Sequence, residues 1–390
     1  MDSRLSIKTT IEPLPTEKKS PGSIAIFIPS LRGGGAERVM MILANDFSAR
    51  GYPTDLLLAK DTGPYRDQLS AKVNVIDFGS DGVLKALLPL YRYLKKHNPD
   101  VLLSAMTHSN IVSLWAGKLS GANTRLVVSE RNALPHDQGG ITGMQRFGFP
   151  LLTKAFYPWA HAIVCVSQGL SDDLIQKTPR IKNKVYTVYN PVVTEELLNR
   201  KNERVKHPWF DEREKTGCRV VLAAGRLNEQ KDFGTLIKAI SNVKKRLNVK
   251  LIILGEGSLR RELEQLIAGL DLGNTIDLYG FANNPFAFMK QADLFVLSSR
   301  WEGLPGVLIQ AMACGTPVVS TDCPHGPAEI LENGTWGKMV AVGDANALAN
   351  AIIETLTNPS QPDVSIRASD FGQETASSRY LEVMGLKAIT

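Results

Sequence analysis

The segment from Leu294 to Ser320 restricts most strongly how this chain can fold. Its first residues, Leu294-Phe-Val-Leu-Ser298, are an apolar run that predicts a buried strand, and Glu302 to Gly306 predict a loop. A short helix should follow. Gly315 fits the end of that helix, Pro317 prevents its continuation, and the chain should then return as a second strand. Because ligands in open parallel sheets bind at the carboxyl ends of strands, the loop at Glu302 is a candidate binding site.

The loop residues favour a ligand that carries hydroxyl and phosphate groups. Gly303 and Gly306 let the backbone approach a ligand closely, and the N-terminus of the following helix attracts anions. Glu302 can accept hydrogen bonds from sugar hydroxyls, and Gln310 offers both a donor and an acceptor on the first turns of the helix. A tight turn with a solvated glutamate accounts for the same residues equally well when they are considered alone.

Strand-like and helix-like segments alternate from Ser23 onward, which is the pattern of parallel sheets with crossover helices. With 390 residues, the chain is long enough for two domains with separate cores. A polar run from Glu195 to Thr216 follows Tyr189-Asn-Pro-Val192 and indicates the boundary between them. We therefore expect an α/β protein with a disordered tail at 1–22, a first doubly wound domain at 23–190 and a second at 191–370. The expected strands are 24–28, 55–58, 73–76, 101–105, 126–129, 163–166, 185–188, 220–224, 250–254 and 275–278, besides the two named above.

The composition narrows the classes of partner. A net charge of +6 favours nucleotide phosphates or an anionic membrane surface, and we find no nucleic-acid recognition motif. The sequence contains no run of about 18 apolar residues, so no transmembrane helix is expected. The first residues lack the apolar centre of a signal peptide. The four cysteines show no metal-ligand spacing, so we expect reduced, buried thiols in a cytoplasmic protein.

Three glycines, Gly33 to Gly35, separate the first strand from a helix that should run from Ala36 to about Arg50. Such a turn suits close approach to a phosphate. It matches neither the G-x-G-x-x-G pattern nor the P-loop, which argues against a dehydrogenase. A plain turn between strand and helix is an equally good interpretation.

Polar residues follow two further strands of the first domain. His108, in Met106-Thr-His-Ser-Asn110, is a candidate contact for a sugar, and a hydrogen-bonded structural histidine is the alternative. Glu130 and Arg131, after the next strand, should face the same edge of the sheet, with solvated charge as the alternative.

Arg226 and Lys231 lie between a strand that ends at Ala224 and a helix that begins at Phe233. Fixed cations at that edge can stabilise the charge that develops on a leaving diphosphate, an effect typically of about 3 kcal/mol per group. A lone arginine or lysine would more often be solvated.

Two basic amphipathic segments have two interpretations each. Gly143 to Trp159 contains Arg146 and Lys154 among apolar residues, and could lie on an anionic membrane. The simpler interpretation is a crossover helix that packs on the sheet and begins or kinks at Pro150. The helix expected between Leu84 and His97 has the same ambiguity.

These motifs together resemble the retaining group 1 (family 4-like) glycosyltransferases of the GT-B fold. EGLPGVLIQAMACGTPVV, which starts at Glu302, is similar to the donor-binding segment of that family, and G-R-x4-K-D-F, which starts at Gly225, to its diphosphate-binding motif. LGEG, YGFAN and DCPHGPAEI match further family elements. The family pattern has a second glutamate where this chain has Gln310.

The resemblance implies two Rossmann-like domains facing each other across a cleft, with a C-terminal helix at 371–390 that crosses back to the first domain. It implies that Arg226 and Lys231 stabilise the leaving diphosphate, that Glu302 orients the donor sugar, and that Gln310 holds the ribose. His108 joins them as a contact for the donor sugar. The remaining substrate-binding candidates are Gly33, Gly34, Gly35, Glu130, Arg131 (these two on the acceptor side), Gly255, Gly257, Phe281, Gly303, Leu304, Pro305, Gly306, His325 and Gly326. For His325, a helix cap is the alternative.

The implied function is transfer of a sugar, with retention of configuration, from a nucleotide diphosphate sugar to a glycan or lipid-linked acceptor in cell-surface polysaccharide or glycan biosynthesis. The donor is expected to be UDP-linked, and the enzyme to work in the cytoplasm, peripherally on the inner face of the plasma membrane. The chain lacks an Asp-x-Asp motif, and no metal or cofactor is expected. A UDP-sugar epimerase of the same fold and, because of Gln310, an inactive nucleotide-sugar-binding protein are the alternatives.

Overall fold

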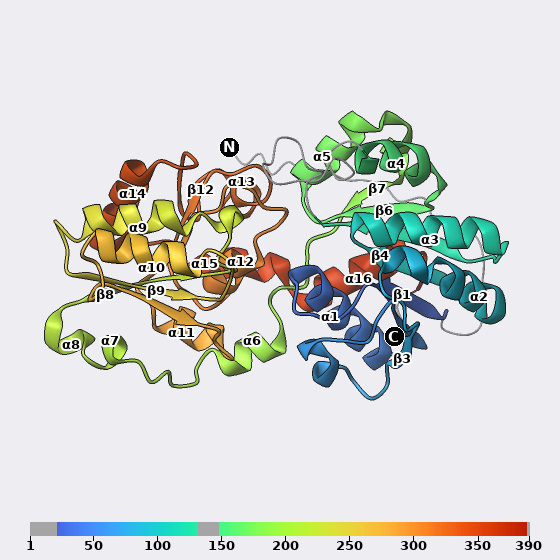
Figure 1. Cartoon of the computed structure of the whole chain (residues 1–390), viewed down its shortest axis with the longest axis horizontal. Helices are drawn as coiled ribbons and strands as arrows, with labels where there is room; N and C mark the ends of the chain where they lie inside the picture. The colour runs from blue at the N-terminus through green and yellow to red at the C-terminus, as the bar shows by residue number, and fades with distance from the viewer. Residues whose placement is uncertain (1–21, 132–147, 388–390) are drawn as a thin grey trace, which may run out of the picture.

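The structure is a computed structural model that describes residues 22–131 and 148–387. The described residues form two α/β domains that lie side by side, each built on an open parallel sheet (Figure 1). The expected α/β class with two doubly wound sheets is confirmed. The expected tail up to Pro21, Asn132 and the stretch from Gly143 to Phe147 lie outside the described residues.

The first domain contains a seven-stranded parallel sheet in the order β3-β2-β1-β4-β5-β6-β7. All residues of β1 and β4 are buried, as expected for continuous apolar runs in a sheet covered on both faces. The strand order reverses between β1 and β4, so the loops that follow these two strands form a topological switch point. The strands are β1 (Ile24–Ile28), β2 (Thr54–Leu58), β3 (Asn74–Asp77), β4 (Val101–Ala105), β5 (Arg125–Glu130), β6 (Ala162–Cys165) and β7 (Val185–Thr187). The helices are α1 (Gly35–Ala49), α2 (Leu87–His97), α3 (Thr107–Ser120), α4 (Phe149–Phe156) and α5 (Gln168–Lys177), with the short turns η2 (Val83–Ala86) and η4 (Tyr157–Trp159).

The second domain contains a six-stranded parallel sheet in the order β10-β9-β8-β11-β12-β13, whose switch point lies between β8 and β11. The strands are β8 (Arg219–Ala224), β9 (Val249–Leu254), β10 (Ile276–Gly280), β11 (Leu294–Leu297), β12 (Val318–Thr321) and β13 (Lys338–Val340). The helices are α6 (Glu195–Arg200), α7 (Pro208–Asp211), α8 (Arg213–Thr216), α9 (Phe233–Val243), α10 (Arg260–Gly269), α11 (Pro285–Gln291), α12 (Gly306–Ala313), α13 (Pro327–Ile330), α14 (Ala345–Thr357) and α15 (Val364–Ala368). Apart from β13, which has three residues and was not expected, the strands lie within two residues of their expected bounds.

The chain crosses between the domains twice, and the two crossings lie against each other. The backbone N–H groups of Val192 and Val193 each donate to Phe371 O at 3.0 Å, and Gln373 N donates to Val193 O at 3.0 Å. Helix α16 (Gln373–Val383) then packs beside α1, and its Tyr380 is buried in the core of the first sheet (Figure 1). This pairing holds the two sheets close to each other at their carboxyl edges.

Two further expectations can be compared with the structure. All four cysteines are buried and have free thiols, as expected. Within the described ranges, no helix combines the length and the apolar character that a membrane span requires.

Candidate functional site

The switch point of the second sheet places the loops after β8 and β11 next to each other. Strands β8 and β11 are paired neighbours, so the loop that carries Arg226 and Lys231 lies beside the loop that begins at Ser298. Ser298 Oγ donates to Lys231 O at 2.7 Å, and Arg300 N donates to Gln230 O at 2.8 Å. These contacts make the two loops one structural unit.

Lys231 and Glu302 form an ion pair at the centre of this unit. Lys231 Nζ lies 2.5 Å from Glu302 Oε1, and both side chains are largely buried. Ser299 Oγ donates to the same carboxylate oxygen at 2.7 Å. Since Lys231 and Ser299 both contact the Glu302 carboxylate, that carboxylate has a defined position from which to accept hydrogen bonds from hydroxyl groups.

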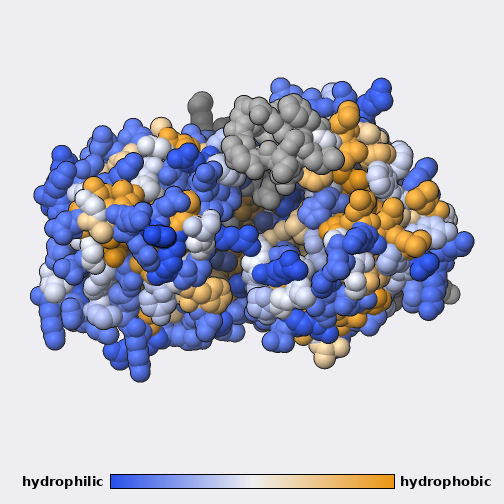
Figure 2. Space-filling view, viewed as in Figure 1, coloured by the Kyte–Doolittle hydropathy of each residue, from blue (hydrophilic) through white to orange (hydrophobic). Residues whose placement is uncertain are grey.

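Arg226 lies at the boundary with the first domain. Its Nη2 is 3.9 Å from the position that a Cβ would occupy on Gly34, in the glycine loop (Ser30–Gly35) that follows β1. That Cβ would also lie 2.4 Å from Glu37 Oε2, so a larger residue at position 34 would displace this carboxylate. The glycine loop and the cation Arg226 therefore lie close together at the domain boundary, and Figure 2 shows a hollow between the two domains.

Glycines shape the turn that carries Arg226. A Cβ on Gly255 would lie 2.0 Å from Gly225 O, and one on Gly257 would lie 2.4 Å from Leu227 O. These two glycines therefore allow the turn after β9 to pack directly on the turn after β8. Their substrate-binding role remains a prediction, and their geometric role is to hold Arg226 in place.

The donor-loop candidates Gly303, Leu304 and Pro305 are buried beneath the turn after β12. A Cβ on Gly326 would meet Pro305 Cδ at 2.5 Å, and Glu302 N donates to Pro324 O at 3.3 Å. Gly306 begins α12 and lies against Val192 at the domain crossing. Gln310 follows one turn later and is partly exposed.

His325 reaches toward the first domain. Its Nδ1 lies 2.9 Å from the place of a Cβ on Gly169, in the first turn of α5. The alternative role as a helix cap does not fit, because the N-cap of α13 is Gly326 and no side chain caps it. Beside this contact, Gln168 N donates to both carboxylate oxygens of Glu329 at 2.8 Å, so α5 and α13 also meet across the domain boundary.

His108 lies in the first turn of α3, at the switch point of the first sheet. Met106, two residues before His108, has φ 75° and ψ 135°. Residues other than glycine rarely adopt this conformation, and where they do it is often at a functional site. Burial lowers the pKa of His108, which favours the neutral imidazole.

A buried polar network supports this turn. Glu130 accepts hydrogen bonds from Thr107 Oγ1, at 2.8 Å, and from Tyr157 OH. Asn110 Nδ2 donates to Tyr157 OH at 3.0 Å. Burial raises the pKa of Glu130.

The predicted substrate contacts of Glu130 and Arg131 stay predictions, and both side chains have partners within the protein. Glu130 is 2% exposed and its two oxygens are engaged by Thr107 and Tyr157. Arg131 is 6% exposed and donates to Ser129 Oγ, Tyr380 OH and Asn190 Oδ1. Both residues therefore support the His108 turn and the domain crossing.

Phe281 directly follows β10, whose last residue, Gly280, accepts a hydrogen bond from Gly255 N at 2.7 Å, and Phe281 is 78% exposed. The sequence motifs do not predict the contacts of Glu37, Ser299 or Arg38, although all three residues lie within or beside the site. Glu37 had a local signal, since it stands three residues after the N-cap Gly34 and accepts a hydrogen bond from Gly34 N, which is half of a capping box. No group of three or more His, Cys, Asp or Glu side chains suited to a metal ion occurs within 22–131 and 148–387.

Two family models match this chain. Residues 33–196 match the model described as "Glycosyltransferase Family 4", and residues 218–358 match "Glycosyl transferases group 1". An uncharacterized glycosyltransferase of Methanocaldococcus jannaschii is 31% identical over 255 residues, which are 64% of this chain and 62% of the relative. The N-acetylgalactosamine-N,N'-diacetylbacillosaminyl-diphospho-undecaprenol 4-alpha-N-acetylgalactosaminyltransferase of Campylobacter jejuni is 30% identical over 334 residues, 83% of this chain and 87% of the relative.

The fold matches solved structures of the same architecture. The crystal structure of the Anabaena protein HepE in complex with UDP-glucose superimposes with a TM-score of 0.75 at 21% identity, over 93% of this chain and 98% of HepE. The expected GT-B arrangement of two facing parallel sheets is thereby confirmed.

Proposed function

The chain belongs to the group 1 glycosyltransferases, and from that premise we propose that it transfers a hexose or N-acetylhexosamine from a UDP-linked donor with retention of configuration. The observation that carries this proposal is the joined Lys231–Glu302 unit with Arg226 facing the glycine loop. Binding of UDP-glucose by HepE and the N-acetylgalactosamine transferred by the Campylobacter relative support a UDP-linked sugar.

In the proposed reaction, the bond between the sugar C1 and the diphosphate oxygen breaks, and the electron pair stays on the diphosphate. Arg226 and Lys231 stabilise the added negative charge because they are fixed before the bond breaks. An acceptor hydroxyl oxygen forms the new bond to C1, and its proton passes to the departing diphosphate oxygen, which carries the electron pair of the broken bond. Glu302, held by Lys231 and Ser299, orients the hydroxyls of the donor sugar.

The nucleotide part of the donor is assigned to the second domain. We place the base against the turn at Phe281, whose exposed aromatic ring offers a stacking surface. Gln310 is assigned to the ribose hydroxyls and the neutral His108 to the sugar. His325 and Gly326 close the site beside the donor loop.

The acceptor is assigned to a pocket of about 310 Å³ at the carboxyl ends of β1, β2 and β3. It contains Arg32, a cation that suits a phosphate-bearing acceptor, and Lys60, which forms an ion pair with Asp81 at 2.6 Å; it adjoins the glycine loop through Ser30. The Campylobacter relative acts on a diphospho-undecaprenol glycan, which supports a lipid-linked acceptor. The pocket is lined by Pro29, Ser30, Arg32, Ala59, Lys60, Ser80, Asp81, Gly82 and Val83.

A docking surface for the membrane lies beside this pocket. Hydrophobic residues gather over α3 and α4 of the first domain (Figure 2), and α2, α3 and α4 pack next to each other. Basic side chains on the same elements would attract anionic lipid. The apolar members of this surface are Leu84, Leu88, Leu119, Leu151 and Trp159, and the basic members are Lys85, Arg92, Lys118 and Lys154.

Incubation with a panel of UDP-sugars tests the proposal. UDP release that depends on a lipid-linked or glycan acceptor supports it. Isomerised sugar without acceptor would indicate an epimerase, and nucleotide binding without turnover would indicate an inactive binding protein. A thermal-shift screen of the same panel identifies the donor to use, because a bound ligand stabilises the folded state.

A further inference from the structure

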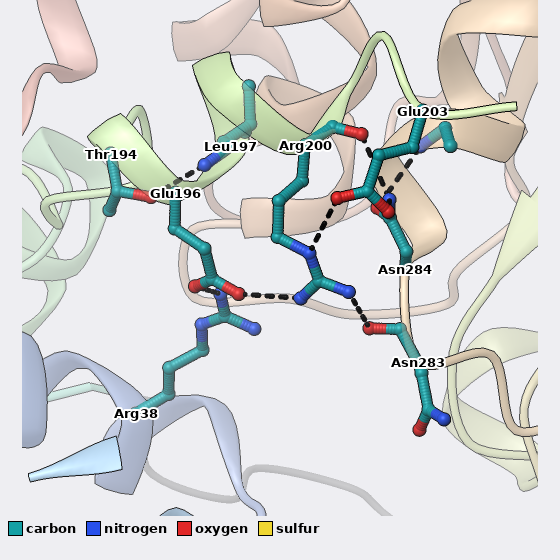
Figure 3. A network of polar contacts seen from close by, with 9 residues as sticks. Arg38, Thr194, Glu196, Leu197, Arg200, Glu203, Asn283 and Asn284 are labelled. Atoms are coloured by element: carbon teal, nitrogen blue, oxygen red, sulfur yellow. Dashed lines mark hydrogen bonds and ion pairs between the residues drawn. The ribbon is translucent and has the colours of Figure 1, made fainter.

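Arg38, on helix α1 of the first domain, makes two contacts with the second domain. Its Nη2 lies 3.0 Å from Glu196 Oε2 on α6 (Figure 3), and its guanidinium carbon lies 5.7 Å from the centre of the Phe286 ring on α11. The Arg38 side chain is 24% exposed and that of Glu196 is 41% exposed. An ion pair and a cation–π contact thus join α1 to two helices across the domain boundary.

Glu196 is in turn held within the second domain. Arg200 Nη1 donates to Glu196 Oε1 at 2.9 Å, and Arg200 Nη2 donates to Asn283 O at 3.2 Å (Figure 3). Asn284 Nδ2 donates to Arg200 O at 2.9 Å. This network ends two residues from Phe281, on the turn assigned to the base of the nucleotide.

The other end of the network is the glycine loop. Glu37, next to Arg38 in the chain, accepts hydrogen bonds from Gly34 N, at 2.5 Å, and from Ser30 Oγ, at 3.1 Å. Arg38 N donates to Gly34 O at 3.0 Å, the first helical bond of α1. Because these bonds fasten the loop to the first turn of α1, whatever fixes α1 also fixes the glycine loop.

We propose that Arg38 is a positioning residue, which sets the distance between the glycine loop and the nucleotide-sugar bound on the second domain. It acts by joining α1 to α6 and α11, and through Arg200 to the turn at Phe281. This role rests on the proposed function, because it presumes that the cleft between the domains binds a UDP-sugar. Arg38 itself touches neither the sugar nor the diphosphate in this scheme.

The kinetic test compares Arg38→Gln with Arg379→Gln. Arg379 is a matched control, because it forms a partly exposed ion pair with Glu382 inside α16 and crosses no domain boundary. For Arg38→Gln we expect kcat with the best UDP-sugar to fall about fivefold or more, while the Kd of UDP changes less than about twofold, since the nucleotide contacts lie on the second domain. An unchanged kcat, or a Kd that rises as much as kcat falls, would overturn the proposal.

Glu196→Gln and the double variant Arg38→Gln/Glu196→Gln complete a double-mutant cycle. If the two side chains act as one unit, Glu196→Gln lowers kcat by a similar factor and the double variant is no slower than Arg38→Gln. Two effects that simply multiply would show that Arg38 does not work through Glu196.

Amide hydrogen exchange of the ligand-free protein separates this inference from the proposed donor. Peptides covering Ser30 to Met41 should exchange faster in Arg38→Gln than in the wild type and in Arg379→Gln, while peptides from β8 and β9 stay unchanged. Unchanged exchange of the glycine loop overturns the inference even if kcat falls. If the wild type binds no UDP, the donor proposal fails, and the exchange result still decides whether Arg38 positions the loop.

Discussion

Lys231 and Glu302 are separated by 71 residues in the chain, yet Lys231 Nζ lies 2.5 Å from Glu302 Oε1. The contact arises because β8 and β11 are neighbours in the second sheet and their loops emerge at the same edge. The pair combines a cation for the proposed leaving diphosphate with a carboxylate for the sugar. A diphosphate that enters the site would share Lys231 with Glu302, so binding and orientation of the donor are coupled.

Replacing Arg226 with alanine should lower turnover without unfolding the protein. Arg226 is exposed, so its removal leaves the core intact, but the leaving diphosphate loses a fixed cation. We expect turnover to fall by about a hundredfold or more, measured as UDP release. Lys238→Ala, an exposed lysine of α9, is the control, and near-normal turnover in Arg226→Ala would contradict the assignment of the leaving-group site.

Replacing Lys231 with methionine should cost both stability and activity. The substitution leaves the buried Glu302 carboxylate with Ser299 and Gln230 as its remaining polar partners. We expect a loss of about 3 kcal/mol in the free energy of unfolding, measured by urea titration. The double variant Lys231→Met/Glu302→Gln should recover most of that stability and remain inactive; a double variant as unstable as the single one would argue against the buried pair.

Replacing Gln310 with glutamate should tighten UDP binding. A carboxylate accepts both ribose hydroxyls as charge-assisted hydrogen bonds, an advantage of about 1 kcal/mol, or roughly a fivefold lower Kd. Turnover should change little, whereas Glu302→Gln should cut turnover strongly with a small change in Kd. The Kd of UDP by calorimetry and the turnover, measured on both variants, test this prediction. If the wild type is inactive and Gln310→Glu is active, the binding-protein alternative is favoured.

Lowering the pH should destabilise the wild type through His108. Burial lowers the pKa of His108 below its usual value, so between that pKa and about 6.5 the unfolded chain binds more protons than the folded one. This contribution to stability is complete above about pH 6.5 and is lost as the pH falls toward the lowered pKa. Between pH 7.5 and 5.5, the free energy of unfolding should therefore fall more in the wild type than in His108→Gln.

The control for this measurement is His97→Gln, since His97 is exposed at the end of α2. This variant should follow the wild type at both pH values. If His108→Gln loses as much stability as the wild type, the histidine does not stay neutral in the folded protein.

Removing two exposed leucines should weaken membrane binding. Leu84 is 67% exposed and Leu88 is 52% exposed, next to Lys85 and Arg92. Leu84→Ser/Leu88→Ser should bind anionic liposomes more weakly than the wild type, and wild-type binding should fall steeply with added salt. The control is Leu198→Ser, since Leu198 is 45% exposed on α6. Equal binding of the wild type to neutral and anionic vesicles would contradict a role of Lys85 and Arg92 in membrane binding.

The sequence by itself determined the class of fold and most of the strands. Apolar runs such as Ile24–Ile28 and Val101–Ala105 are local signals, because a buried parallel strand needs little more than a continuous apolar segment between turns. The motif around Glu302 and the glycine turns at Gly33 and Gly225 are local in the same way. Strand β13 was not predicted, because its three residues, a lysine and two apolar residues, are too few to show a periodic pattern.

Only the tertiary structure decided which polar residues are available to a ligand. Glu130 and Arg131 stand at the end of a strand, as binding residues often do, yet Tyr157 and Tyr380 close over them from segments far along the chain. Arg38 follows the glycine turn in the sequence, but its proposed role depends on Glu196, which lies 158 residues away in the chain. Hydrophobic period and turn chemistry act between near neighbours in the chain, whereas burial and ion pairing depend on which loops the packed sheets bring together.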